Sequence, residues 1–146
     1  MALFVCGIFI ACDPVFFIDY SICNKSGHDV TITSTPIKGL KESLWDDNPN
    51  GIIAKDGVDT MVYTIEGIGT ANLPTAKAKL KLCVYGDTVT FTFDDGKQLF
   101  YYKQNDNGVF DVKSSNYSWS SKMDGLISRF GYLKYTITQE DYNNAR

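Results

Sequence analysis

The chain has 146 residues, enough for one domain with one hydrophobic core and too few for two. Hydrophobic residues make up 44% of the sequence and charged residues 21%, a balance that disfavours disorder. The formal net charge of -3 disfavours a nucleic-acid partner, whose phosphates require a basic surface. Nine Phe, nine Tyr and two Trp favour β-structure, because aromatic side chains fit half-buried pleated surfaces.

Residues 1–11, with the sequence MALFVCGIFIA, form an apolar run directly before Cys12. The run is too short to span a bilayer, which takes about 20 residues, but it fits the apolar part of a signal peptide. The segment Phe9-Ile10-Ala11-Cys12 resembles a lipobox, in which a small residue precedes the cysteine that is lipidated. We therefore predict a signal peptide at 1–11, a lipidated tether at 12–15 and one domain at 16–146. The alternative is a buried N-terminal strand at 1–11.

The remaining cysteines leave two alternatives open. If Cys6 is removed with the signal peptide and Cys12 carries lipid, Cys23 and Cys83 remain as one pair in a compartment where a disulfide persists. Alternation places both on strand faces that they share with polar residues, which disfavours a bridge between two sheets. A bridge within one sheet needs neighbouring strands with Cα atoms within about 7 Å of each other. We expect two free, non-catalytic thiols.

Alternating polar and apolar residues predict β-strands through most of the chain after the tether. Segments 17–23 and 29–33 are predicted to form a hairpin around Lys25-Ser26-Gly27, because glycine suits the last position of a three-residue loop. The register that this loop sets aligns the apolar residues of both strands on one face: Ile22 opposite Val30, and Tyr20 opposite Ile32.

Segments 77–85, 88–93 and 97–102 are predicted to form a three-stranded meander with two-residue turns at Gly86-Asp87 and Asp95-Gly96. In this register three large side chains, one from each strand, pack together in the core: Leu82, Phe91 and Phe100. Lysines alternate on the outer face of the first strand, where they protect a sheet edge or, alternatively, meet an anionic polysaccharide or lipid headgroup: Lys77, Lys79 and Lys81.

Segments 51–54, 60–66 and 130–138 complete the predicted strands, and Thr138 suits the N-cap of one helical turn after it. The predicted fold class is all-β: an antiparallel β-sandwich, immunoglobulin-like or related, of about eight short strands with a one-turn C-terminal helix. A barrel is the alternative, but the sequence lacks the ladder of small and large interior residues that favours one.

No motif in the sequence predicts catalysis, a cofactor or a metal ion. His28 is the one histidine, and a triad or a zinc site requires further partners, so we interpret it as a polar turn residue. The acidic pairs Asp46-Asp47 and Asp94-Asp95 have the residue types of a glycosidase, but adjacent residues of a strand or turn point to different sides. The loop at 46–51 is rich in oxygen ligands without matching an EF-hand. We expect no enzyme, no cofactor and no metal site.

Three aromatic residues lie outside the predicted strands, in two long polar segments: Trp45, Tyr117 and Trp119. Their flat faces, beside amides and carboxylates, are candidates for binding sugar rings. The alternative, which we favour, is that they plug the open ends of the sandwich.

Four stretches resemble small uncharacterised lipoproteins of gut Bacteroidota: the apolar start ending in Cys12-Asp13, NKSGHDV at 24–30, FTFDDGK at 91–97 and YTITQEDY at 135–142. The resemblance implies a β-sandwich at the outer membrane, on its surface or its periplasmic face, and it implies no activity. We therefore expect a non-enzymatic envelope lipoprotein, held at the membrane by its lipid anchor, that binds another protein or assists a surface complex. The alternative is a glycan-binding accessory module that uses the three aromatic residues above.

Overall fold

The computed structural model describes residues 15–35, 51–80, 84–124 and 128–146. In chain order they form β1 (Val15–Asn24), β2 (Val30–Ser34), β3 (Ile52–Ala54), β4 (Asp59–Ile68), α1 (Leu73–Lys79), β5 (Thr88–Phe93), β6 (Gln98–Tyr102), the 3-10 turns η2 (Lys103–Asn105) and η3 (Gly108–Phe110), β7 (Tyr117–Asp124), β8 (Ser128–Ile137) and α2 (Gln139–Asn144).

The strands form two four-stranded sheets, which confirms the predicted β-sandwich with a short C-terminal helix. The first sheet has the strand order β4-β1-β8-β7, and the second has the order β3-β2-β5-β6. Every pairing is antiparallel except that of the two central strands of the first sheet, β1 and β8, which run parallel. The first and last strands of the domain therefore lie side by side in the middle of the first sheet.

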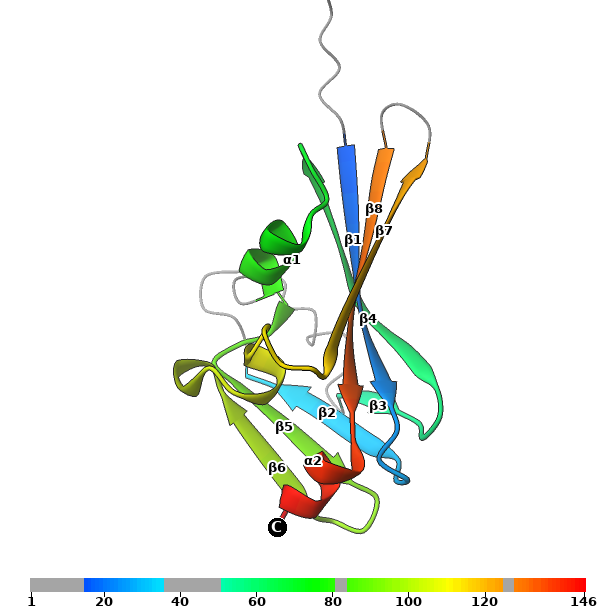
Figure 1. The fold of residues 1–146 in the computed structure, drawn as a ribbon. Coiled ribbons are helices and arrows are strands. Elements are labelled where there is room, and N and C mark those ends of the chain that lie inside the picture. Colours follow the sequence, from blue (N-terminus) through cyan, green and yellow to red (C-terminus); the bar gives the residue numbers. More distant parts are fainter. Residues whose placement is uncertain (1–14, 36–50, 81–83, 125–127) are drawn as a thin grey trace, which may run out of the picture.

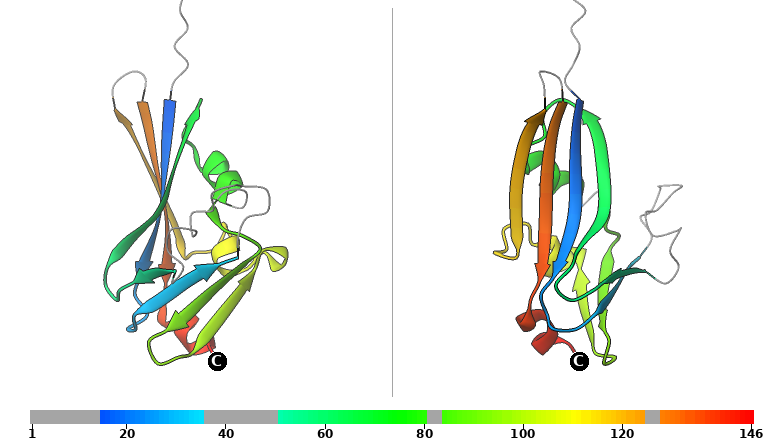
Figure 2. Two further views of the ribbon diagram at one scale, coloured as in Figure 1. Left: turned by 180° about the vertical axis from the view of Figure 1, so that it is seen from behind. Right: turned by 90° about the vertical axis from the view of Figure 1, so that its right-hand side faces the viewer.

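The two sheets meet over only part of their length (Figures 1 and 2). The second sheet crosses the lower part of the first, while the upper part of the first sheet extends beyond it and has α1 on its inner side. Alternation along the strands fills the space between the layers with buried side chains, among them Ile18, Tyr20, Ile22, Val30, Ile32, Val89, Phe91, Phe93, Leu133, Tyr135 and Ile137. Strand β1 begins at the upper end of the first sheet.

The predicted hairpin of β1 and β2 is wrong, because these strands belong to different sheets. The buried side chain of Asn24 turns the chain from one sheet to the other. Its Nδ2 donates to His28 O and to Ala54 O (both 2.7 Å), and its Oδ1 accepts from Ser26 Oγ (2.7 Å). Alternation predicts which residues of both strands are buried, but the loop length does not reveal that the chain changes sheets.

The predicted strand at 77–85 is also wrong, because its first part belongs to α1. Asn72 is the N-cap, and its Oδ1 accepts from Thr75 N–H (2.8 Å). Ala76 and Leu80, four residues apart, are buried as a helical face, and Tyr20 OH donates to Ala76 O (2.7 Å). These contacts fix the helix against the inner side of the first sheet.

The predicted lysine stripe fails for the same reason. Lys77 and Lys79 lie in the last turn of α1, where residues two apart point in different directions. Their positive charges are favourable at the C-terminal end of a helix. Lys81 and Leu82, together with Cys83, lie outside the described residues.

Strands β5 and β6 form the predicted hairpin, but one residue out of the predicted register. Phe91 lies opposite Leu99 instead of Phe100. The connecting loop, Asp94-Asp95-Gly96, has three residues instead of two, and its glycine adopts a φ of 89°. A shift of one residue turns a strand over, so Tyr101 is buried and Phe100, predicted to be in the core, is exposed.

The other predicted elements β3, β4, β8 and α2 lie where the sequence places them. Thr138 caps α2 through a capping box with Asp141. Strand β7 is the element that the prediction misses. Its inner side carries Tyr117 and Trp119, and serines alternate with them, a composition that resembles a polar loop.

Candidate functional site

Strand β6 is an edge of the second sheet, and some of its backbone hydrogen-bonding groups point away from the sheet. Lys103, directly after the strand, donates its N–H to Asp87 O (2.9 Å). Every second residue before Lys103 therefore also directs its backbone N–H and C=O groups towards β5. The N–H and C=O groups of Phe100 and Tyr102 therefore point outwards along the edge. Such groups are able to pair with a further extended chain.

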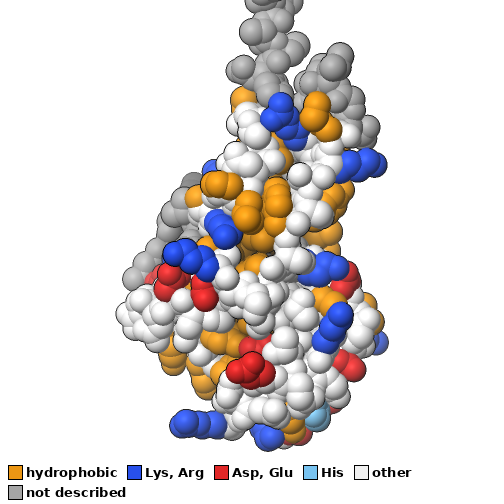
Figure 3. Space-filling view, in the orientation of Figure 1, with side chains coloured by type: hydrophobic (Ala, Val, Ile, Leu, Met, Phe, Trp, Pro, Cys, Tyr) orange, Lys and Arg blue, Asp and Glu red, His pale blue; other side chains and the backbone are white. Residues whose placement is uncertain are grey.

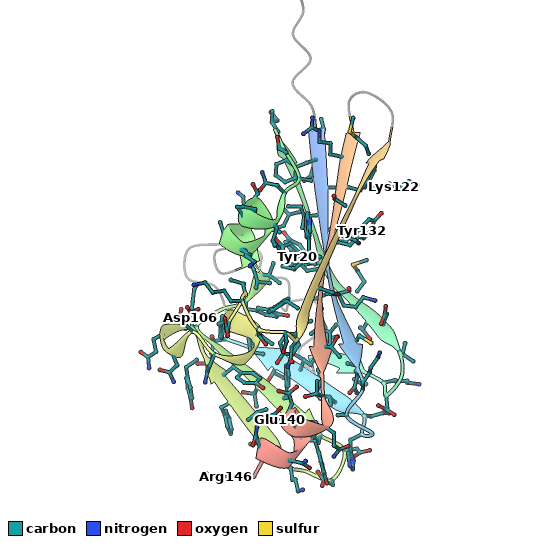
Figure 4. All side chains as sticks on the ribbon, viewed as in Figure 1. Tyr20, Asp106, Lys122, Tyr132, Glu140 and Arg146 are labelled. Atoms are coloured by element: carbon teal, nitrogen blue, oxygen red, sulfur yellow. The ribbon has the colours of Figure 1, made fainter. Side chains whose placement is uncertain are left out.

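One end of this edge already carries a strand-like pairing. Gln98 N–H donates to Arg146 O (2.8 Å), and Arg146 N–H donates to Gln98 O (3.0 Å). This exchange of two bonds is that of an antiparallel β-pair. Arg146 lies at the end of the chain after α2 (Figure 4). Across the described residues, no other backbone pairing occupies this edge.

Two exposed aromatic rings accompany the open edge. The side chains of Phe100 and Tyr102 are 45% and 41% exposed. They share the outer face of the sheet with the threonines of β5, because the observed register places Thr90 opposite Phe100 and Thr88 opposite Tyr102. The strand therefore offers apolar rings and free backbone groups together.

Two grooves meet at Tyr102 on β6. One has a volume of about 490 Å³, and its other lining residues are Asp87, Thr88, Lys103 and Gln104. The second has a volume of about 340 Å³, and it is also lined by Gln98, Leu99, Phe100, Asn144 and Arg146. The lining combines aromatic rings with amides, one carboxylate and two cations, so it provides both apolar contact and hydrogen bonds for a ligand.

Of the sequence-predicted site residues, Tyr117 and Trp119 lie together on the inner side of β7. Tyr117 OH donates to Val109 O (2.5 Å), its ring packs against Tyr135 with centroids 5.0 Å apart, and burial raises its pKa well above the usual value. Trp119 is half-buried over Gly131, where a Cβ atom would lie 2.2 Å from the indole ring. Both rings pack against the core of the domain, and both also line a groove of about 220 Å³ between β7 and α1 that includes Leu73 and Lys77. Trp45 and the predicted lipidation site Cys12 lie outside the described residues.

His28 belongs to a cluster of polar contacts at the lower end, beside α2. Its Nδ1 lies 2.8 Å from Asp94 Oδ1, and its ring stacks on Tyr142 with centroids 3.9 Å apart. Lys97 Nζ lies 4.0 Å from the centroid of the same tyrosine ring, whose hydroxyl donates to Asp95 Oδ2 (2.8 Å). The hydrogen bonds from Lys97 N–H and Tyr142 OH hold the pKa of the Asp95 carboxyl below its usual value. The cluster joins α2 to the β5–β6 loop.

Cys23 is a buried free thiol near an ion pair on the outer side of the first sheet. Burial and a hydrogen bond with Asp59 raise the pKa of the thiol. Asp59 also pairs with Lys134, which lowers the pKa of the carboxyl. A thiol in this environment is a poor nucleophile. The described residues contain no group of His, Cys, Asp or Glu side chains that could hold a metal ion.

Sequence reasoning missed Phe100 and Tyr102 because it shifted β6 by one residue. The loop composition left two loop lengths open. Asp94-Asp95-Gly96 suits a three-residue loop as well as Asp95-Gly96 suits a two-residue turn, since both end in the glycine that takes a positive φ. The longer loop exposes the two aromatic rings and the shorter one buries them.

Comparisons with known proteins do not assign the chain to a family. No protein-family model and no curated protein matches it. Among solved structures, IP-1A from Alcaligenes faecalis is similar over 85% of this chain and 94% of that chain, with 14% sequence identity and a TM-score of 0.24. A likeness of this size supports no conclusion about fold or function.

Proposed function

We propose that this chain is a non-enzymatic envelope lipoprotein whose domain binds an extended segment of another protein along the β6 edge. The observation that carries the binding role is the open edge itself. The outward backbone groups of Phe100 and Tyr102 lie between two grooves, and Arg146 already pairs with Gln98 at one end. Strand addition of this kind takes affinity from backbone hydrogen bonds and specificity from alternate side chains.

The side chains beside the edge favour a segment with apolar and acidic residues. Apolar side chains of the partner would pack on the exposed rings of Phe100 and Tyr102. Lys103 and Arg146 line the two grooves and would attract carboxylates. Asp87, the acidic residue of the larger groove, would oppose a second acidic group there.

Glycan binding is the second candidate function, and the same grooves favour it. Exposed aromatic rings with amides and a carboxylate around them suit sugar rings and their hydroxyls. This candidate uses Phe100 and Tyr102 instead of the three aromatic residues that the sequence suggested.

Amide hydrogen exchange on the full chain separates the two functions. Peptides selected from a displayed library of extended sequences, and glycans selected from an array, are each added to the protein. Strand addition should protect the amides of Phe100 and Tyr102 from exchange, because both donate to the new strand. Stacking of a sugar on the rings leaves these amides unprotected and supports the second candidate.

A matched pair of variants locates the binding surface. Phe100→Thr with Tyr102→Thr keeps β-propensity and removes both rings, and peptide affinity should fall at least about tenfold, as for the loss of central aromatic contacts. Ile53→Thr removes a side chain that is 57% exposed on β3, the opposite edge of the same sheet, and should leave affinity unchanged. Equal losses in both variants, or no amide protection by any peptide, would contradict strand addition.

The envelope part of the proposal rests on the apolar run before Cys12, which fits a lipidation signal. Among the described residues there is no helix long and apolar enough to cross a membrane. Cys12→Ala should move the protein from the membrane fraction to the soluble fraction, and Cys6→Ala is the matched control that should not. A Cys12→Ala protein that stays in the membrane fraction contradicts a lipid anchor.

A further inference from the structure

The upper end of the first sheet carries unusual exposed side chains. Ile68 at the end of β4 is 73% exposed and Met123 on β7 is 62% exposed. They are the two most exposed large hydrophobic side chains of the described chain. They lie on the two edge strands of the same sheet, at the end where β1 begins at Val15 (Figure 1).

Basic side chains accompany these two residues. Lys122 projects outwards from β7, on the same face of the sheet as Ile68 (Figure 4), whereas Arg129 lies opposite Met123 on β8 and both belong to the inner face. On the face shown in Figure 3, basic and hydrophobic side chains occur along the whole height of the part coloured by type, while the acidic ones lie at mid-height and below. The nearest acids along the two edge strands are Glu66 on β4, two residues before Ile68 or about 7 Å along the strand, and Asp124, which follows Met123 at the end of β7.

Aromatic rings continue the apolar surface below the end of the sheet. Phe17 on β1 stacks on Phe130 of β8, with ring centroids 5.2 Å apart and planes 15° apart. Both face the outer side of the sheet, on the same side as Ile68. Exposed aliphatic side chains, cations and aromatic rings together are the composition of surfaces that sit at a membrane–water interface.

We propose that the upper end of the first sheet, formed by Ile68, Met123, Lys122 and Arg129, contacts the lipid surface directly and sets the orientation of the domain. The inference rests on the proposed lipid anchor. Cys12 and Val15 are three residues apart, so a fully extended tether spans at most roughly 11 Å. An anchor that short keeps this end of the domain at the headgroups, where anionic lipids attract the two cations.

Contact of the upper end with lipid places the β6 edge on the far part of the molecule. β6 belongs to the second sheet, which crosses the lower part of the first (Figures 1 and 2). The edge that we propose for partner binding is then directed away from the membrane, where an extended segment can reach it.

Depth-dependent quenching in membranes tests the contact on the full, cell-processed chain. A fluorescent amino acid is introduced by stop-codon suppression at position 68 or 123, and at position 53 or 100 as controls on the other sheet. Each protein is reconstituted into vesicles of phosphatidylethanolamine and phosphatidylglycerol that contain nitroxide-labelled lipid. Quenching should be several times stronger at 68 and 123 than at 53 and 100. Equal quenching at all four positions would falsify the contact.

The charges provide a second readout that a chance orientation would not show. Lys122→Gln or Arg129→Gln should each shift the equilibrium away from lipid contact by about fivefold in phosphatidylglycerol vesicles. Phosphatidylcholine vesicles should reduce the effect of both substitutions. Substitutions without effect on quenching in the anionic vesicles contradict the role of the cations.

The Cys12→Ala fractionation separates a failure of this inference from a failure of the lipid anchor. If Cys12→Ala is released from the membrane and the unaltered protein shows uniform quenching, the result supports the lipid anchor and refutes the contact. Retention of Cys12→Ala in the membrane with strong quenching at 68 and 123 refutes the anchor and supports the contact.

Discussion

The lower and upper ends of the molecule differ in how their exposed groups are used. At the lower end, where α2 and the two sheets meet, polar side chains are paired within the chain: His28 with Asp94, Tyr142 with Asp95, and Asp141 with Tyr101. At the upper end the first sheet continues alone, and Ile68 and Met123 face solvent.

This difference separates the paired polar cluster beside α2, which holds the fold, from the exposed residues at the upper end of the first sheet. Asn24 and Asp141 are buried with their hydrogen bonds satisfied, so the lower end stabilises the domain. Two highly exposed aliphatic side chains at one end contribute little to folding. Their exposure is better explained by contact with another surface.

Alkaline pH should cause the largest loss of stability, because it acts on several buried tyrosines at once. Burial raises the pKa of Tyr85, Tyr101, Tyr117 and Tyr135, and the protonated folded state is therefore favoured. Their contribution to stability is complete below about pH 10 and is lost above it, by about 1.4 kcal/mol per pH unit for each group, since the unfolded phenols ionise first.

Spectrophotometric titration with near-ultraviolet circular dichroism checks this pH dependence. Phenolate from the buried tyrosines should appear in the same cooperative step as the loss of the dichroism signal. Tyr85→Phe should reduce the phenolate formed in that step. Ionisation of all tyrosines before any loss of tertiary structure would count against the buried environment.

Phe91→Ala tests the core between the sheets. The ring is fully buried and packs edge-on against Tyr101 and Tyr135, so its removal should lower the free energy of unfolding by about 3–5 kcal/mol. Phe100→Ala, on the neighbouring strand, should change it by less than about 0.5 kcal/mol. Urea unfolding of both variants measures the contrast. A large loss of stability for Phe100→Ala would support the register with the two-residue turn.

Asn24→Ala probes the crossing between the sheets at the lower end. It leaves His28 O and Ala54 O without their amide donor in a buried site, and should lower the free energy of unfolding by about 2–3 kcal/mol. Lys25→Ala, at the exposed neighbouring position, is the control and should have almost no effect. Similar values for the two variants in urea unfolding would show that the Asn24 side chain does not hold this connection.

The smallest effect is expected at the upper end. Ile68→Ser and Met123→Ser should each change the free energy of unfolding by less than about 0.5 kcal/mol, because both side chains are already solvated. Ile18→Ser, in the buried face of β1, should be strongly destabilising in the same assay. A large loss from either exposed position would mean that it packs in the fold and would weaken the comparison of the two ends.

The candidate site shows how far local sequence signals reach. Alternation correctly separates Phe91 from Thr90 and Thr92, because one side of β5 must be buried. It cannot decide the orientation of β6, where Leu99, Phe100, Tyr101 and Tyr102 are all large and hydrophobic or aromatic. Loop length settles the orientation, and the loop sequence is compatible with two lengths.

Local patterns in the chain predict the all-β class, the buried faces of β1, β2, β5 and β8, and the capped helix α2, because alternation and capping act between near neighbours. The parallel pairing of β1 with β8 and the change of sheet at Asn24 are visible only in the folded structure. These features depend on contacts between residues more than a hundred positions apart, or on a buried side chain with one partner, Ala54, on a different strand. No local pattern encodes such choices, and they decide which edge and which end of the protein remain open for contact.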